Sequence, residues 1–77
     1  MSEYFTEVEA RQAINRTRYA ARDLPGVAAG TLAWVGNFEQ APNGEGYLVV
    51  IRWDFRNGRP FRYAKLTKDE FERDTTI

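Results

Sequence analysis

The chain contains neither cysteine nor histidine, and these two absences exclude much of the usual chemistry of protein sites. Without cysteine there is no disulfide and no thiolate metal ligand. Without histidine the chain lacks the commonest general base and the commonest neutral metal ligand. No glycine-rich stretch matches a phosphate-binding loop. We therefore expect no metal site, no cofactor and no catalysis by this chain alone.

Net charge and long apolar runs are also missing. Eleven basic and eleven acidic side chains cancel, so the chain as a whole has no electrostatic preference for nucleic acid or for an acidic surface. No apolar run approaches the roughly 20 residues of a membrane helix. The start, Met1-Ser2-Glu3-Tyr4, lacks the basic and apolar regions of a signal peptide. These features predict a cytoplasmic protein that does not enter a membrane.

The sequence instead holds a strong β-strand signal at 46–55, GYLVVIRWDF, in which β-branched and aromatic residues lie between two turn-forming segments. Its alternate residues compete for the core, with Tyr47, Val49, Ile51 and Trp53 against Leu48 and Val50. In the preceding strand, at 31–38, Gly36 is expected to mark a bulge or bend. The other expected strands cover 16–23, 31–38 and 61–65, and residues 75–77 are expected either to fray or to add a short terminal strand.

Two capping boxes predict helices at the two ends of the chain. Thr6 and Glu9 open a helix that runs from Glu7 to near Asn15, and Thr67 and Glu70 open a single turn that ends near residue 73. The carboxylates of this last turn, at positions 69, 70, 72 and 74, are expected to face solvent.

These elements predict one domain over 1–77, mainly β, with a helical extension at 1–15 and a small SH3-like barrel at 16–77. The barrel has four to five antiparallel strands, a short N-terminal helix and a one-turn C-terminal helix. An OB-fold is the alternative, although it usually needs more residues and a longer helix between its third and fourth strands.

The segments Pro25-Gly26-Val27, Gly30-Thr31, Gly46-Tyr47 and 67–72 resemble a group of small bacterial proteins that has an SH3-like barrel and no assigned activity. More distantly, the Gly-Thr turn and the Gly-Tyr strand are similar to the small stromal subunit of photosystem I and to the variable chain of ferredoxin:thioredoxin reductase. In those families the barrel is a non-catalytic docking or stabilising piece. The plasmid-type trimethoprim-resistant dihydrofolate reductase has the same size and fold, but its pore-lining Val-Gln-Ile-Tyr segment has no counterpart here.

Aromatic and basic residues alternate around the expected hairpin at 56–59, and this pattern carries the functional hypotheses. The candidate partner-binding residues are Arg52, Trp53, Arg56, Arg59, Arg62, Tyr63 and Lys65, with Trp34 and Phe38 as a second patch. Trp, Tyr and Arg concentrate the energy of protein interfaces, so the main hypothesis is a protein-binding or adaptor module, including a homodimer formed through a sheet edge.

Two alternatives stay open for the same residues. The aromatic rings with adjacent arginines also suit a small barrel that binds single-stranded nucleic acid by stacking and by neutralising phosphates. Alternatively, Trp53, Phe61 and Tyr63 fill the core and the arginines only face water.

Overall fold

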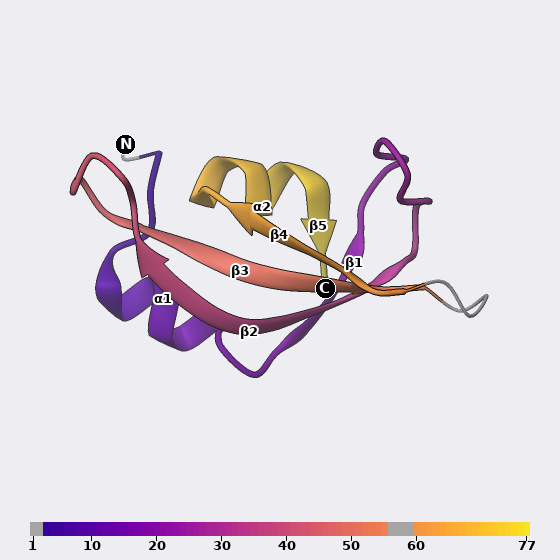
Figure 1. Ribbon diagram of the computed structural model, residues 1–77, viewed down its shortest axis with the longest axis horizontal. Helices are drawn as coiled ribbons and strands as arrows, with labels where there is room; N and C mark the ends of the chain where they lie inside the picture. The colour runs from indigo at the N-terminus through magenta and orange to yellow at the C-terminus, as the bar shows by residue number, and fades with distance from the viewer. Residues whose placement is uncertain (1–2, 56–59) are drawn as a thin grey trace.

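The computed structural model describes residues 3–55 and 60–77. They form one antiparallel sheet of five strands in the order β4-β3-β2-β1-β5, with two short helices (Figure 1). The strands are β1 (Thr17–Ala20), β2 (Leu32–Gln40), β3 (Tyr47–Asp54), β4 (Arg62–Leu66) and β5 (Thr75–Thr76), and the helices are α1 (Glu7–Ala13) and α2 (Lys68–Asp74).

The core lies on one face of this sheet. Val49, Ile51 and Trp53 of β3 point into it, so this set of alternate residues fills the core and Leu48 and Val50 do not. Their neighbours across β2 are small, because Val35 pairs with Ile51 and Ala33 pairs with Trp53. Both helices pack against the same face through Ala10 of α1 and Phe71 of α2. The opposite face of β2, β3 and β4, called the outer face below, has no helix packed on it among the described residues.

Gly36 does interrupt β2, as predicted. The pairing register between β2 and β3 shifts between Val35 and Asn37, which is the signature of a β-bulge. A bulge inserts one residue into the alternation, so the core-facing positions of β2 change parity there. Val35 faces the core before the bulge, and Phe38, which pairs with Val49, faces it afterwards.

Both predicted capping boxes are confirmed. In each, the threonine side chain accepts from the backbone N–H of the glutamate, and the glutamate side chain accepts from the backbone N–H of the threonine. The second helix is longer than the single turn expected, since α2 continues to Asp74. The first strand is shorter than the predicted 16–23, and β2 continues two residues beyond the predicted end at Phe38.

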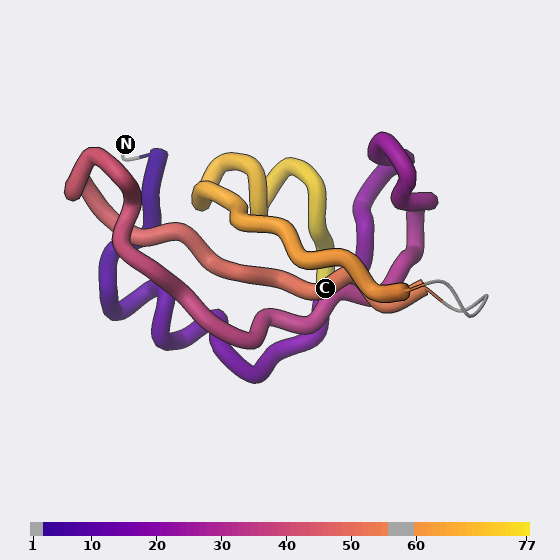
Figure 2. The backbone as a smooth tube through the Cα atoms, in the orientation of Figure 1, coloured from indigo at the N-terminus to yellow at the C-terminus, as the bar shows by residue number. Residues whose placement is uncertain are grey.

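The prediction of a closed barrel is wrong for the described part of the chain. β4 and β5 are the two edges of the sheet and do not pair with each other. β5 has only two paired residues, and α2 occupies the chain between the two strands, so the connection crosses the core face instead of closing the sheet (Figure 2). The loop after β1 contacts the beginning of β4 instead, because the Arg62 guanidinium donates to the Pro25 carbonyl at 3.0 Å.

Candidate functional site

A row of large side chains crosses the outer face of the sheet. Trp34 of β2 lies opposite Arg52 of β3, and Arg52 lies opposite Tyr63 of β4. These positions alternate with the buried residues of each strand, so the three side chains share the solvent side. Phe61, which comes just before β4, joins them. Below, Trp34, Arg52, Phe61 and Tyr63 are called the outer patch.

Arg52 stands at the centre of the outer patch. Its guanidinium carbon lies 5.2 Å from the centre of the Trp34 ring and 5.0 Å from that of Phe61, both within the range of cation–π attraction. Asp54, two residues further along the same strand, holds the other side of the guanidinium, with Oδ1 2.8 Å from Nε and Oδ2 3.1 Å from Nη2. The hydrogen bond with Asp54 is the main cause that raises the pKa of Arg52.

The aromatic rings of the patch are largely open to solvent. Phe61 is 54% exposed and Tyr63 is 62% exposed, and their rings meet edge to face with centres 5.7 Å apart. Trp34 is half-buried beside them. Large aromatic side chains usually lose most of their accessible surface on folding. A contiguous group that keeps it is typical of a surface that a partner covers.

The basic residues of this region are engaged within the molecule. The Lys65 ammonium pairs with Glu39 at 2.8 Å, the Arg62 guanidinium donates to the Pro25 carbonyl, and Arg52 is held by Asp54. Phosphate binding depends on cations that can exchange small counterions for the nucleic acid. Those that the structure describes between Arg52 and Lys65 already have partners. The candidates Arg56 and Arg59 lie outside the described residues.

The structure separates two of the other predicted site residues from the outer patch. Trp53 is only 2% exposed and belongs to the core, as the core interpretation expected for it. Phe38 faces the core side, where its ring meets Tyr47 edge to face with centres 5.7 Å apart. Trp34 and Phe38 therefore do not form a common patch, because the bulge at Gly36 places them on opposite faces of β2.

Asp54 and Phe61 belong to the site although sequence reasoning did not place them there. The signal for Asp54 was its spacing, since residues two apart on a strand share a face and Asp54 follows Arg52 by two. Phe61 was not among the candidate partner-binding residues, and one of the alternatives placed it in the core. Phe61 comes just before β4 and follows Pro60, which has no N–H to donate to a strand partner.

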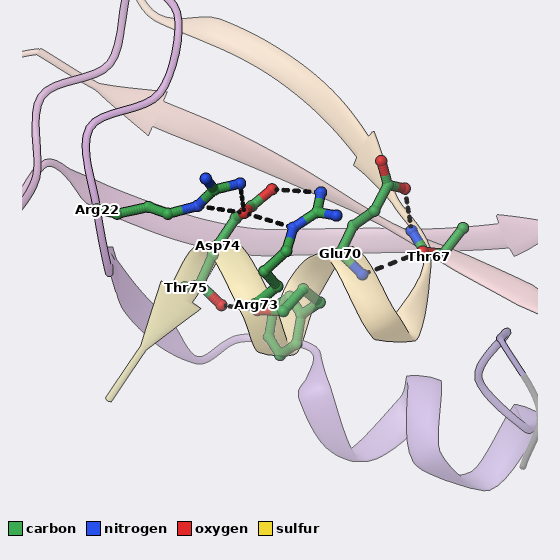
Figure 3. A network of polar contacts seen from close by, with 7 residues as sticks. Arg22, Thr67, Glu70, Arg73, Asp74 and Thr75 are labelled. Carbon is green, nitrogen blue, oxygen red and sulfur yellow. Dashed lines mark hydrogen bonds and ion pairs between the residues drawn. The ribbon is translucent and has the colours of Figure 1, made fainter.

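The carboxylates of the last helix do not all face solvent, contrary to the expectation. Asp74 is buried at the end of α2, where Oδ1 accepts from Arg22 at 2.8 Å and from Arg73 at 2.9 Å (Figure 3). The hydrogen bond from Arg73 is the main cause that lowers the pKa of Asp74, and that from Arg22 lowers it further, while burial acts in the opposite direction. This network joins α2 to the segment after β1.

Within residues 3–55 and 60–77 there is no cluster of three or more acidic side chains that could hold a metal ion. No helix in this same part of the chain is long and apolar enough to cross a membrane. Comparison with protein-family models, with curated proteins and with solved structures finds no match to this chain. The resemblances drawn from its sequence motifs therefore stay predictions.

Proposed function

We propose that the protein is a non-catalytic protein-binding module that uses the outer patch together with the neighbouring edge of β4. The observation that carries the proposal is the exposure of Phe61 and Tyr63 around an arginine held in place by Asp54. Rigid aromatic anchors beside a fixed guanidinium lose little conformational freedom when a partner covers them. β4 adds an edge on which a partner strand can pair, because its only strand neighbour in the described sheet is β3.

The order β4-β3-β2-β1-β5, with a helix just before the last strand, supports an SH3-like fold that is opened along one side. We propose this as the finer class of the sheet. An open edge suits the binding role, since the strand that closure would cover stays accessible. The cytoplasmic location stays a prediction.

Nucleic acid is the second candidate, because exposed aromatic rings stack on bases. The pairing of Lys65 with Glu39 and of Arg52 with Asp54 weighs against it, since it leaves this surface with little uncompensated positive charge. The net charge of zero weighs in the same direction. A protein partner does not need that charge.

A second copy of the chain is the first partner to test. We expect sedimentation velocity to show association that grows with concentration, and ¹⁵N-NMR shifts of β3 and β4 amides over the same range. The double substitution Phe61→Ser/Tyr63→Ser should abolish both effects. Val8→Ser is the matched control, because Val8 is an apolar residue of α1 with 64% exposure and lies outside the outer patch.

Two results would contradict this proposal. Association that persists in the Phe61→Ser/Tyr63→Ser variant would place the interface elsewhere. Alternatively, mixed oligonucleotides added to the monomer at low salt and at physiological salt could shift β3 and β4 amides in a salt-sensitive way. That outcome would favour the nucleic-acid interface, because phosphate contacts weaken steeply with salt. A strictly monomeric protein that ignores oligonucleotides would direct the search to a different protein chain.

A further inference from the structure

A solvent-facing cleft of about 800 Å³ lies between α1, α2 and the start of β1, on the core side of the sheet and away from the outer patch. Four of the twelve lining residues are apolar, namely Phe5, Ala13, Phe71 and Ile77, and the other eight are polar or charged, with Arg16 and Arg18 on the β1 side. Small-ligand sites combine apolar surface with polar groups that fix the orientation of the ligand, and this cleft offers both.

Arg18 is the distinctive group of the cleft. Its guanidinium carbon lies 4.4 Å from the centre of the Phe71 ring. Arg18 Nε donates to Thr75 Oγ1 at 3.0 Å, and Arg18 Nη2 donates to the Thr75 carbonyl oxygen, also at 3.0 Å. A guanidinium has five N–H donors, so three are left over. The described residues offer no carboxylate within 4.0 Å of Arg18.

The partly buried charge of Arg18 is therefore only partly compensated. Burial lowers the pKa of Arg18, and the more distant negative charge of Glu72 raises it. Arg52, which is the other half-buried arginine among the described residues, has a close carboxylate in Asp54. A cation that is held in position by neutral acceptors and stacked on a ring is arranged to receive an anion from outside.

The charges around the cleft limit that anion to one unit of charge. Three basic and two acidic residues line it, and one basic residue, Lys68, is already paired with the acidic Glu9. Glu72 also lines the cleft, and it would repel a doubly charged phosphate more than a single carboxylate. The planar carboxylate also matches the fork of the guanidinium.

We propose that the cleft between α1 and α2 binds a small monocarboxylate with an apolar body. In this arrangement the carboxylate accepts hydrogen bonds from the end of the Arg18 guanidinium, and the apolar body lies against Ala13 and Ile77, the apolar lining residues that keep accessible surface. The site is independent of the outer patch, which lies on the other face of the sheet.

Phenylacetate is the probe, and phenylacetamide is its neutral counterpart of nearly the same shape. Phenylacetate should shift the ¹⁵N-NMR signals of β1, of β5 and of residues near Phe71, with a Kd of about 1 mM. Phenylacetamide should bind at least about tenfold more weakly, because it lacks the charge that Arg18 recognises. Inorganic phosphate should bind more weakly than phenylacetate.

Arg18→Gln should weaken phenylacetate binding by about tenfold or more. Arg11→Gln is the matched control, since Arg11 lies on α1 outside the cleft, and it should bind as the parent protein does. If Arg18→Gln does not fold, the comparison of the three ligands on the unchanged protein decides alone. Equal binding of the amide, stronger binding of phosphate, or no shift at millimolar phenylacetate would each overturn the proposal.

Discussion

At the scale of the single residue, Asp74 differs from the other carboxylates of its helix in what surrounds it. It is buried, and its side chain accepts hydrogen bonds from Arg22 and from Arg73 (Figure 3). The next residue, Thr75, begins β5 and takes hydrogen bonds from Arg18. Asp74 and Thr75 thus attach the C-terminal corner to β1 through arginine side chains, at a point where β5 itself has only two residues.

We predict that Asp74→Asn lowers the free energy of unfolding at neutral pH by about 2 kcal/mol, because two guanidinium groups lose their charged acceptor. The arginines hold the pKa of Asp74 below its usual value near 3.9. A carboxyl whose pKa is lowered by folding stabilises the protein above the unfolded pKa, and this contribution disappears as the pH falls through the folded pKa. The difference in free energy of unfolding between the parent protein and Asp74→Asn should therefore become smaller below about pH 4.

Urea denaturation from about pH 7 to about pH 2 measures this gap directly. Asp69→Asn is the control, because Asp69 is an exposed acid in the first turn of the same helix and should matter by only a few tenths of a kcal/mol. A loss in Asp74→Asn that stays constant across the pH range would show that the effect is one of packing and not of charge.

At the scale of the element, the sequence predicts a structural feature correctly where the residues that interact lie within a few positions of each other. The capping boxes at Thr6 and Thr67 join residues three apart, so they could be predicted from spacing alone. The bulge at Gly36 could also be predicted from the glycine. Its effect on Phe38 could not, because which face of β2 holds the core depends on the register with β3.

Gly36→Ala tests why a glycine stands in the bulge. Its φ lies outside the left-handed region, so the steric contact decides: an added Cβ would collide with Trp34 Cζ3 and lie 2.9 Å from Trp34 Cε3. The Trp34 ring must move away, and we expect a loss of about 1–3 kcal/mol of stability and a changed tryptophan near-UV circular dichroism signal. The outer patch should be disturbed with it, because Trp34 is one of its members.

A double-mutant cycle isolates that contact. In a Trp34→Leu background, the ring that blocks the Cβ is gone, and Gly36→Ala should then lose less stability than it does in the parent protein. An equal loss in both backgrounds would mean that the backbone of the bulge, and not the ring, excludes the alanine.

At the scale of the whole molecule, the sequence predicts the number of strands and names Trp34, Arg52 and Tyr63 of the outer patch, but it predicts neither the open sheet nor the place of Phe61 in the patch. Closure would require β4 and β5 to pair across a gap that α2 spans, and no local pattern reports the length of that gap. Phe61 shows the same limit. It is exposed because it lies on the outer face beside Arg52 and Tyr63, and which face of the sheet is covered depends on how the distant elements pack.

Contacts between the two helices join the two ends of the described chain. Glu9 of α1 pairs with Lys68 of α2, and the rings of Phe5 and Phe71 meet beneath with centres 5.6 Å apart. The hydrogen bond with Lys68 is the main cause that lowers the pKa of Glu9 to about 2, so its stabilising effect is present above the unfolded pKa near 4.3 and fades as the pH falls toward 2.

Glu9→Gln removes the ion pair yet keeps a residue that suits the capping box. We expect the amides of α1, including that of Ala10, to exchange with solvent faster in this variant, while those of β2 and β3 keep their protection. Lys68→Met should have the same effect, and the double variant should add little, because one interaction is lost in each case. Glu7→Gln breaks only an exposed pair with Arg11 and serves as the control. Faster exchange throughout the sheet would instead mean that α1 and the sheet unfold as one unit.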